Sequence, residues 1–251
     1  MSAEFVDRFG AVSDDYSKFR PKYPSAIFDW LASIAPSSSL VWDCATGSGQ
    51  AAVELTARFD RVVATDASPA QIASAVSAPG LTYRVAEASD SGLADQSVDL
   101  ITVAQALHWF DLDAFFAECE RVLVPGGVLA VWSYGPLSVD GKTVDAVIQR
   151  YYHDIVGPWW PPERVLVDSG YASIELPGRG IETPPFEMEA WWTLNQTMGY
   201  LSTWSASSAY RSAMGEDPLV VIENSLGRAW RDPEGERRVR WPLTLRACRS
   251  A

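Results

Sequence analysis

The chain has 251 residues, of which 47% are hydrophobic and 21% charged, and its formal net charge is −12. This length and apolar content suffice for one α/β domain with a sizeable core. The acidic balance argues against a protein of bulk DNA or RNA, because phosphate contacts require a basic face. No run of about 18 apolar residues is present, so no membrane span is predicted. We therefore expect a small-molecule partner, and no nucleic acid, membrane or obligate protein partner.

The cysteines and the first residues of the chain indicate the cellular compartment in which the protein is expected. Cys44, Cys119 and Cys248 are odd in number and lack the close spacing of metal ligands. They predict free thiols in a reducing compartment and no metal site. The start of the chain lacks the basic, apolar pattern of a signal peptide. A cytoplasmic location is the resulting expectation.

The N-terminal arm, residues 1–39, contains one predicted helix, because Ile27, Trp30, Leu31 and Ile34 share a helical face. Short β-rich runs then alternate with helical segments over a core of residues 40–135. Strands are predicted at residues 40–45, 61–66, 81–86, 98–106 and 128–134. An apolar stripe over residues 112–123 predicts a helix that ends before Pro125. This order predicts a doubly wound, Rossmann-like parallel sheet.

The regular alternation ends after residue 135. A helix is predicted over residues 144–156, a strand over 172–176, and a last strand over 239–247. Two further helical faces, beginning near Trp191 and Leu219, predict a helical cap of about residues 186–232. No linker or repeat divides the chain, so residues 1–251 are predicted to form one domain.

A glycine-containing loop, residues 43–50, follows the first predicted strand and opens a helix. Gly47 and Gly49 allow close approach of backbone to a ligand. The pattern also satisfies G-x-G-x-x-A, and Asp66 follows at the distance expected for a ribose contact. The loop by itself therefore leaves a nicotinamide- or flavin-dependent oxidoreductase open.

Three acidic residues favour another ligand. Asp43, Asp66 and Glu87 lie at the carboxyl ends of three consecutive predicted strands. Carboxylates there suit a cationic amino group, a ribose diol and an adenine amine, all of which donate hydrogen bonds, whereas they would repel a pyrophosphate. The set favours S-adenosylmethionine.

With these residues, the chain resembles the class I S-adenosylmethionine-dependent methyltransferases, in the small-molecule branch that includes trans-aconitate methyltransferase. The resemblance is carried by residues 41–50, 64–68, 86–88, 98–100, 104–110 and 121–127, and by Tyr16 and residues 20–24 of the arm. It implies a seven-stranded sheet whose last strand is antiparallel. The usual first glycine of the loop is replaced by Ala45.

The resemblance also implies a set of cofactor contacts. They come from the loop, from the three following strand ends and from the arm, namely Asp43, Ala45, Thr46, Gly47, Ser48, Gly49, Gln50, Asp66, Ala67, Glu87, Ala88, Ala104, Gln105, Ala106, Tyr16 and Arg20.

His108 is the candidate catalytic residue, because it follows the fourth predicted strand at the cofactor edge. Its ordinary pKa near neutrality suits it to act as a general base or a hydrogen-bonding group. Trp109, Tyr23 and Trp204 are further candidates for substrate contact.

Three functions follow in order. The first is methylation of a small molecule, on a carboxylate or hydroxyl oxygen. The others are NAD(P)-dependent oxidation and cofactor binding without catalysis.

Overall fold

The computed structural model describes residues 21–251, so the predictions on Tyr16 and Arg20 lie outside the described residues. Within this range the chain forms a nine-stranded sheet whose main path runs β3-β2-β1-β4-β5-β9-β6. The first five strands are parallel to one another. They are β1 (Val41–Cys44), β2 (Val62–Asp66), β3 (Leu81–Val85), β4 (Val98–Ala104) and β5 (Leu123–Tyr134). The predicted doubly wound parallel sheet is confirmed.

Strands β1 and β4 are buried along nearly their whole length, as their apolar sequences require when helices cover both faces. The two faces have separate apolar cores. One contains Trp42 and Phe115, and the other contains Phe28 and Trp132. The helices of this part are α2 (Ser25–Ile34), α3 (Gln50–Leu55), α4 (Pro69–Ser74), η1 (Leu107–Trp109), α5 (Leu112–Val122) and α7 (Arg164–Asp168).

Local sequence explains where two of these helices begin. The side chain of Ser68 accepts from the backbone N–H of Gln71 at the start of α4, and Pro69 occupies the first turn. Asp111 caps α5 in the same way through Ala114. Both caps lie just after the strand ends, so they fix the direction in which each chain segment leaves the sheet.

The last strand, β9 (Arg237–Arg249), is antiparallel to β5, as predicted. Its 13 residues also pair with three short strands, β6 (Ser138–Val139), β7 (Arg179–Ile181) and β8 (Glu187–Trp192). The predicted count of seven strands is therefore too low. The additional strands form because the far edge of so long a strand would otherwise leave its backbone groups unpaired.

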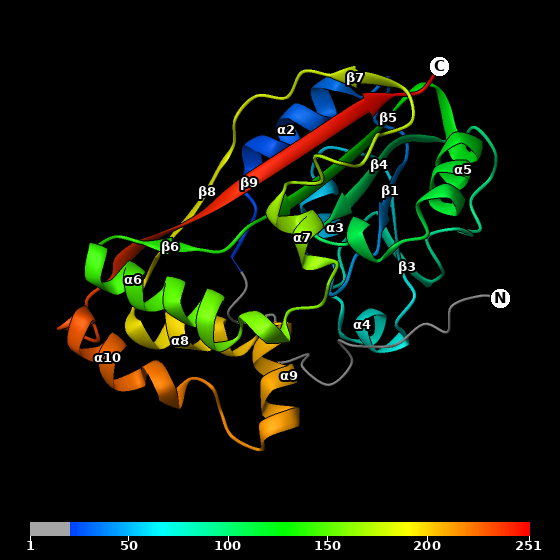
Figure 1. Ribbon diagram of the computed structural model, residues 1–251. Coiled ribbons are helices and arrows are strands. Elements are labelled where there is room, and N and C mark those ends of the chain that lie inside the picture. The colour runs from blue at the N-terminus through cyan, green and yellow to red at the C-terminus, as the bar shows by residue number, and fades with distance from the viewer. Residues whose placement is uncertain (1–20) are drawn as a thin grey trace.

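A third apolar cluster lies beneath the helices at one end of β9. Figure 1 shows β9 running from this group of helices to the far end of the sheet. The elements here are α6 (Lys142–Arg150), the π-helix η2 (Tyr151–Ile155), η3 (Gly157–Trp159), α8 (Leu194–Ser202), α9 (Ser205–Met214) and α10 (Val220–Trp230). Helices α8, α9 and α10 occupy most of the segment predicted as a helical cap.

Two sequence predictions fail in this half. Residues 172–176 are not a strand, because Tyr171 has a positive φ of 58° and backbone hydrogen bonds from Ala172 and Ile174 close turns. Trp191 lies in strand β8 and not on the face of α8, because Thr193 caps that helix through Gln196. In both places hydrogen bonding at a turn or cap overrides an apolar spacing.

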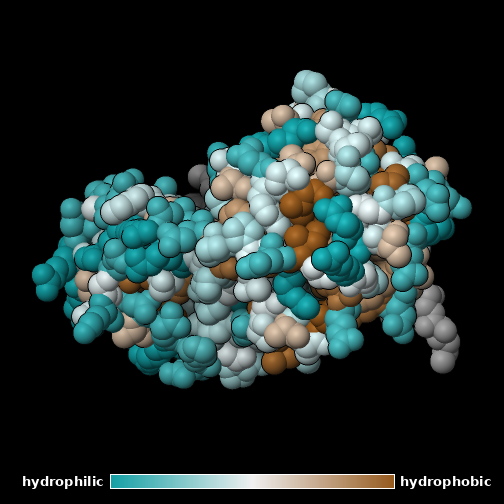
Figure 2. Space-filling model, turned by 90° about the horizontal axis from the view of Figure 1, so that it is seen from above, coloured by the Kyte–Doolittle hydropathy of each residue, from teal (hydrophilic) through white to brown (hydrophobic). Residues whose placement is uncertain are grey.

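The surface is mostly hydrophilic, with an apolar stripe on the face seen in Figure 2. Along residues 21–251, no helix is long and apolar enough to cross a bilayer. Cys44, Cys119 and Cys248 are buried and unpaired, as predicted for free thiols.

Candidate functional site

Four strand ends form one row at the carboxyl edge of the sheet. Because the strand order is β3-β2-β1-β4, the segments after these strands follow one another in space. Adjacent strands lie about 4.8 Å apart, so the row from β3 to β4 spans about 14 Å. Glu87, Asp66, the 43–50 loop and Gln105 stand along this row in that order. The geometry suits an elongated ligand laid across the strand ends.

The loop between β1 and α3 is held in a left-handed backbone conformation at three positions. Ala45, Gly47 and Gly49 have φ values of 53°, 58° and 87°. A Cβ atom placed on Gly49 would lie 1.9 Å from the Tyr83 hydroxyl, which itself donates to the Val76 carbonyl at 2.8 Å. Glycine is thus required at residue 49 both by φ and by the Tyr83 ring. Ala45, at the position usually held by glycine, adopts the same strained region.

Asp43 lies beneath this loop with only 1% of its surface exposed. Its carboxylate accepts hydrogen bonds from the hydroxyls of Thr46, at 2.5 Å, and Thr102, at 2.6 Å. Burial, with a smaller contribution from the negative charge of Asp66, raises the pKa of Asp43 to about 6. The residue therefore ties strand β4 to the loop, and a cation beside it would favour its charged form.

Asp66 organises the second strand end. One carboxylate oxygen accepts from the backbone N–H of Gly47 and the other from that of Ser68, both at 2.9 Å. A carboxylate oxygen can accept more than one hydrogen bond, so these contacts do not prevent Asp66 from also accepting from a ligand. Asp66 thus fixes the glycine loop against the end of β2, next to Ala67.

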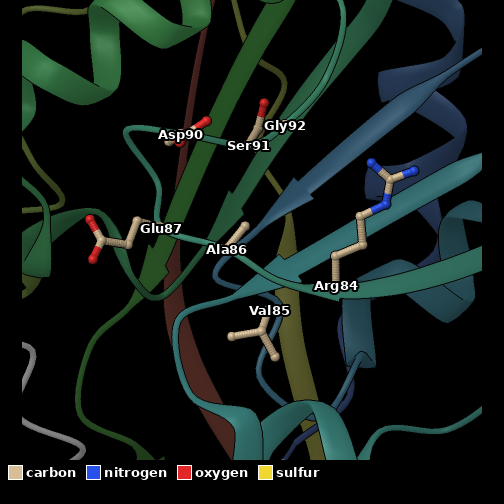
Figure 3. A pocket seen from close by; sticks show the side chains of 7 residues that line it. All are labelled: Arg84, Val85, Ala86, Glu87, Asp90, Ser91 and Gly92. Carbon is tan, nitrogen blue, oxygen red and sulfur yellow. The ribbon is translucent and has the colours of Figure 1, made fainter.

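Glu87 lies on an open cavity of about 370 Å³ at the end of β3. Arg84, Ala86, Asp90 and Ser91 also line it. Figure 3 shows that the Glu87 side chain points away from Arg84 and belongs to the loop that carries Asp90. The carboxylate is therefore exposed at the outer end of the row.

A second cavity, of about 90 Å³, lies at the opposite end of the row, beyond β4 and β5. It is lined by groups from four parts of the chain, namely Gln105, His108, Trp109, Tyr134, Gly135, Pro136, Trp160, Pro161, Arg164, Val167, Tyr200, Trp204 and Ser205. We call it the acceptor cavity. Aromatic rings form much of its wall; the Trp160 and Trp204 ring centroids, for example, are 5.5 Å apart.

The polar groups of the acceptor cavity are mainly donors. Arg164 stacks its guanidinium 4.6 Å from the Trp160 ring centroid, and its Nε donates to Asp168 and to the Tyr152 hydroxyl. His108 Nδ1 lies 3.0 Å from the Tyr171 hydroxyl. Burial, and then the positive charge of Arg164, lowers the pKa of His108 to about 4. His108 is therefore neutral at pH 7.

Gln105 completes the cavity from the end of β4. It has a φ of 59°, and its Nε2 donates to the Tyr134 carbonyl at 3.0 Å. Among residues 21–251, the buried Oε1 of Gln105 and the buried Nε1 of Trp160 have no hydrogen-bond partner. Buried polar atoms rarely remain unpaired, and both line the cavity, so they are available to a bound molecule.

Comparison with known proteins bears on the same region. A family model described as a methyltransferase domain matches residues 42–131, which include β1 to β4 and most of β5. A Dictyostelium discoideum protein, whose name places it among the methyltransferases, is 33% identical over 236 residues, covering 93% of this chain and 90% of the relative. The chain belongs to the S-adenosylmethionine-dependent methyltransferases.

Two further likenesses agree with this family. A solved structure from Anaeromyxobacter dehalogenans, named as a type II methyltransferase, is 48% identical, covers 92% of this chain and 97% of that one, and has a TM-score of 0.86. A Mycobacterium tuberculosis (strain H37Rv) methyltransferase is 37% identical over 127 residues, about half of each chain. The nicotinamide-dependent alternative, left open by the glycine pattern, receives no support.

The methyltransferase structure brings most of the predicted site residues together. The loop residues, Asp66, Ala67, Glu87, Ala88 and the 104–106 segment all lie along the row of strand ends. His108, Trp109 and Trp204 line the acceptor cavity. Tyr23 does not line it, but packs 6.3 Å from the ring of Tyr134, which does. Gln50 Nε2 donates to the Pro21 carbonyl at 2.6 Å, linking the loop to the end of the arm.

Arg164 and Tyr171 were not predicted as site residues. Arg164 begins the short helix α7 after two prolines, and Tyr171 lies immediately before the segment predicted as a strand. Neither belongs to a motif, and both reach the methyltransferase site only through tertiary packing. The Gly170–Tyr171 pair, a glycine followed by a turn, is the one local signal that points away from a strand.

Proposed function

We propose that this methyltransferase transfers a methyl group from S-adenosylmethionine to an oxygen atom, carboxylate or hydroxyl, of a small molecule in the acceptor cavity. The observation that supports this most is the donor-rich, aromatic cavity that adjoins Gln105 and His108 at the end of β4. Its volume of about 90 Å³ suits part of a small metabolite. We also propose that the enzyme belongs to the small-molecule branch of the class I S-adenosylmethionine-dependent methyltransferases.

The residues present fit the cofactor. Asp66 and Glu87 supply carboxylates for the ribose hydroxyls and the adenine amine, beside Ala67 and Ala88. Asp43, with its pKa raised by burial, favours a cationic amino-acid group near the loop residues 45–50. The backbone of residues 104–106, which adjoins the acceptor cavity, is then expected to face the reacting end. Tyr16 and Arg20 remain predicted contacts from the arm.

When bound, the cofactor supplies an activated methyl group on a sulfonium. The protein's own contribution is to hold the acceptor in line and exclude water. The rings of Trp109, Trp160 and Trp204 form apolar walls, while His108 and Arg164 offer donors to the acceptor oxygen or its neighbour. Trp204 is only 6% exposed, so this wall is fixed by the core beneath it.

The rest of the chain serves this site. We propose a single domain of residues 1–251 in which α8 and α9 close the acceptor cavity through Tyr200, Trp204 and Ser205. The buried thiols and the net charge of −12 support a cytoplasmic enzyme without nucleic-acid, membrane or obligate protein partners.

Two measurements test the proposal. Calorimetric titration with S-adenosylhomocysteine is expected to show binding, with none for NAD; no binding of the first would overturn the cofactor assignment. A screen with radiolabelled methyl donor over carboxylic acids, phenols, amines and thiols is expected to label an oxygen acceptor. Labelling confined to amines or thiols, or none at all, would overturn the oxygen assignment. Trp204→Ala, with exposed Trp191→Ala as control, is expected to weaken acceptor use selectively.

A further inference from the structure

We infer that Tyr171 fixes His108 as an Nε2–H hydrogen-bond donor toward the acceptor cavity, so that His108 orients an already ionised acceptor oxygen and does not remove a proton. This inference rests on the proposed function and makes Tyr171 a positioning residue.

The inference rests on the hydrogen bond between the two side chains, in which we assign Tyr171 as the donor. The Tyr171 hydroxyl lies 3.0 Å from His108 Nδ1, and the two rings are stacked at 27° with centroids 6.1 Å apart. The backbone N–H groups of Leu107 and His108 lower the pKa of Tyr171, against the larger effect of burial, which raises it. The phenol therefore keeps its proton, and Nδ1 of His108, 3.0 Å away, is the acceptor that the geometry offers to this O–H. Burial raises the pKa of Tyr171, so this proton stays in place at physiological pH.

A neutral imidazole carries one proton, and if Nδ1 accepts, that proton is on Nε2. His108 is kept neutral by burial and by Arg164, which lower its pKa to about 4. Its free nitrogen is therefore a donor at neutral pH. A general base would need the opposite tautomer, with an unprotonated Nε2 facing the acceptor.

The backbone at Tyr171 shows that this arrangement is imposed by the fold. Tyr171 has a φ of 58°, a left-handed conformation that is strained for a non-glycine residue. It is held there by its own N–H, which donates to the Leu166 carbonyl, and by Arg246, which donates to the carbonyls of Tyr171 and Ile174. Strained residues of this kind cluster at functional sites.

The charge around His108 agrees with an anionic acceptor. In the described part of the chain, Arg164 is the charged side chain that lines the cavity, and it is paired at 2.9 Å with Asp168, which does not line it. Tyr134 and Tyr200 are the titratable hydroxyls of the lining, and the Tyr171 hydroxyl lies 3.0 Å from His108. Within residues 21–251, no carboxylate lines this cavity. The described lining therefore offers hydrogen-bond donors and one positive charge, and it contains no carboxylate that could take a proton from the acceptor.

The transfer step needs no base for such an acceptor. A lone pair of the ionised oxygen forms the new C–O bond while the C–S bond breaks and its electron pair remains on sulfur. The products are the methylated acceptor and S-adenosylhomocysteine, and no proton is released. His108 Nε2–H and Arg164 then hold the anion in line.

The tautomer can be measured without any substrate. The chain has only two histidines, and His153 is exposed, so ¹⁵N-labelled protein gives two ring systems that His153→Gln assigns. We expect His108 to show the Nε2–H tautomer at pH 7 and to stay neutral down to about pH 5. Tyr171→Phe is expected to mix the tautomers, whereas Tyr151→Phe, which removes a buried hydroxyl bonded to Ser207, leaves them unchanged. An Nδ1–H tautomer, or a protonated ring at pH 7, would overturn the inference.

Kinetics give the second test. With the acceptor found by the screen, His108→Ala is expected to lower kcat/KM by about 10- to 100-fold, because a hydrogen bond to a charged group is lost. His108→Gln keeps an N–H near the Nε2 position and is expected to recover activity to within about tenfold of wild type. If His108→Gln is as inactive as His108→Ala, and if the wild-type activity falls with pH at the pKa of His108, then His108 acts as a general base and the inference is wrong. If the methyl-transfer screen finds no acceptor, the proposed function is wrong, but the tautomer of His108 measured by NMR is unaffected.

Discussion

The two ends of the row of strand ends, at the carboxyl edge of the sheet, carry side chains of different chemistry. The ends of β1, β2 and β3 present carboxylates, Asp43, Asp66 and Glu87, whereas the cavity beyond β4 and β5 presents donors and the guanidinium of Arg164. The first set suits a ligand rich in donors, and the second suits an anion. In the proposed function, one sheet edge would discriminate the cofactor from the acceptor by charge, because the two sets of side chains differ in charge although they lie on adjacent strands.

The largest expected effect concerns the rigidity of the carboxylate end. Gly49→Ala is expected to lower the free energy of unfolding by about 2–4 kcal/mol, because the new Cβ meets the Tyr83 hydroxyl at a positive φ. Urea unfolding measures this loss. Gly126→Ala is the matched control, since its φ is 77° and nothing lies within 4 Å of a new Cβ. Equal losses in both variants would show that the Tyr83 contact is unimportant.

Removing the cation of the donor end tests the charge comparison directly. Arg164→Gln is expected to raise the KM for an anionic acceptor by about 10- to 100-fold, the loss of a charge-assisted hydrogen bond, while S-adenosylhomocysteine binding stays unchanged. The pKa of His108 should rise from about 4, because the nearby positive charge is gone. Steady-state kinetics and histidine NMR measure the two effects. Exposed Arg228→Gln is the control, and a similar KM change there would contradict the assignment.

The two ends also respond oppositely to acid. His108 has its pKa lowered from 6.5 to about 4, so its contribution to stability is present above pH 6.5 and is lost as the pH falls toward 4. Asp43 has its pKa raised from 3.8 to about 6, so its contribution grows as the pH falls from 6 toward 3.8. The two effects offset each other across this window.

Asp43→Asn is therefore expected to make stability fall more steeply between pH 6 and pH 4 than in the wild type, by on the order of 2 kcal/mol. His108→Gln is expected to do the reverse and flatten or invert the decline. Urea unfolding at pH 7, 6, 5 and 4 gives the slope of the free energy of unfolding against pH for each protein. This slope does not depend on any loss of stability that is the same at every pH. Parallel curves for all three proteins would refute the compensation.

The smallest expected effect lies in the loop itself. Ala45→Gly is expected to raise the free energy of unfolding by about 0.5–1 kcal/mol, because glycine adopts a φ of 53° without strain. Ala67→Gly is the control: its φ is not positive, so the same change there should destabilise by a similar amount. Thermal denaturation measures both, and a destabilised Ala45→Gly would show that the Cβ of Ala45 makes a packing contact of value.

The carboxylate end could be predicted from the sequence because its information is local. Each acid or glycine follows a buried strand, and the carboxyl ends of parallel strands meet at one edge, so Asp43, Asp66 and Glu87 could be placed before any coordinates. The donor end could be predicted only through His108, Trp109 and Trp204. Arg164 and Tyr171 come from turns with no periodicity, and their position depends on contacts with Trp160, Leu166 and Arg246 that are distant in sequence or set by turn geometry. The short strands along β9 were missed for the same reason.

Strand β9 has a consequence for how the molecule loses its structure. Residues 243–249 pair with β5 in the core sheet, and residues 237–242 pair with β8 beside the helices, with Pro242 at the junction. Melting of either apolar cluster would strip one half of this strand of its partners and weaken the other. Heat should therefore disassemble both regions together, and differential scanning calorimetry is expected to record one endotherm whose calorimetric and van't Hoff enthalpies agree.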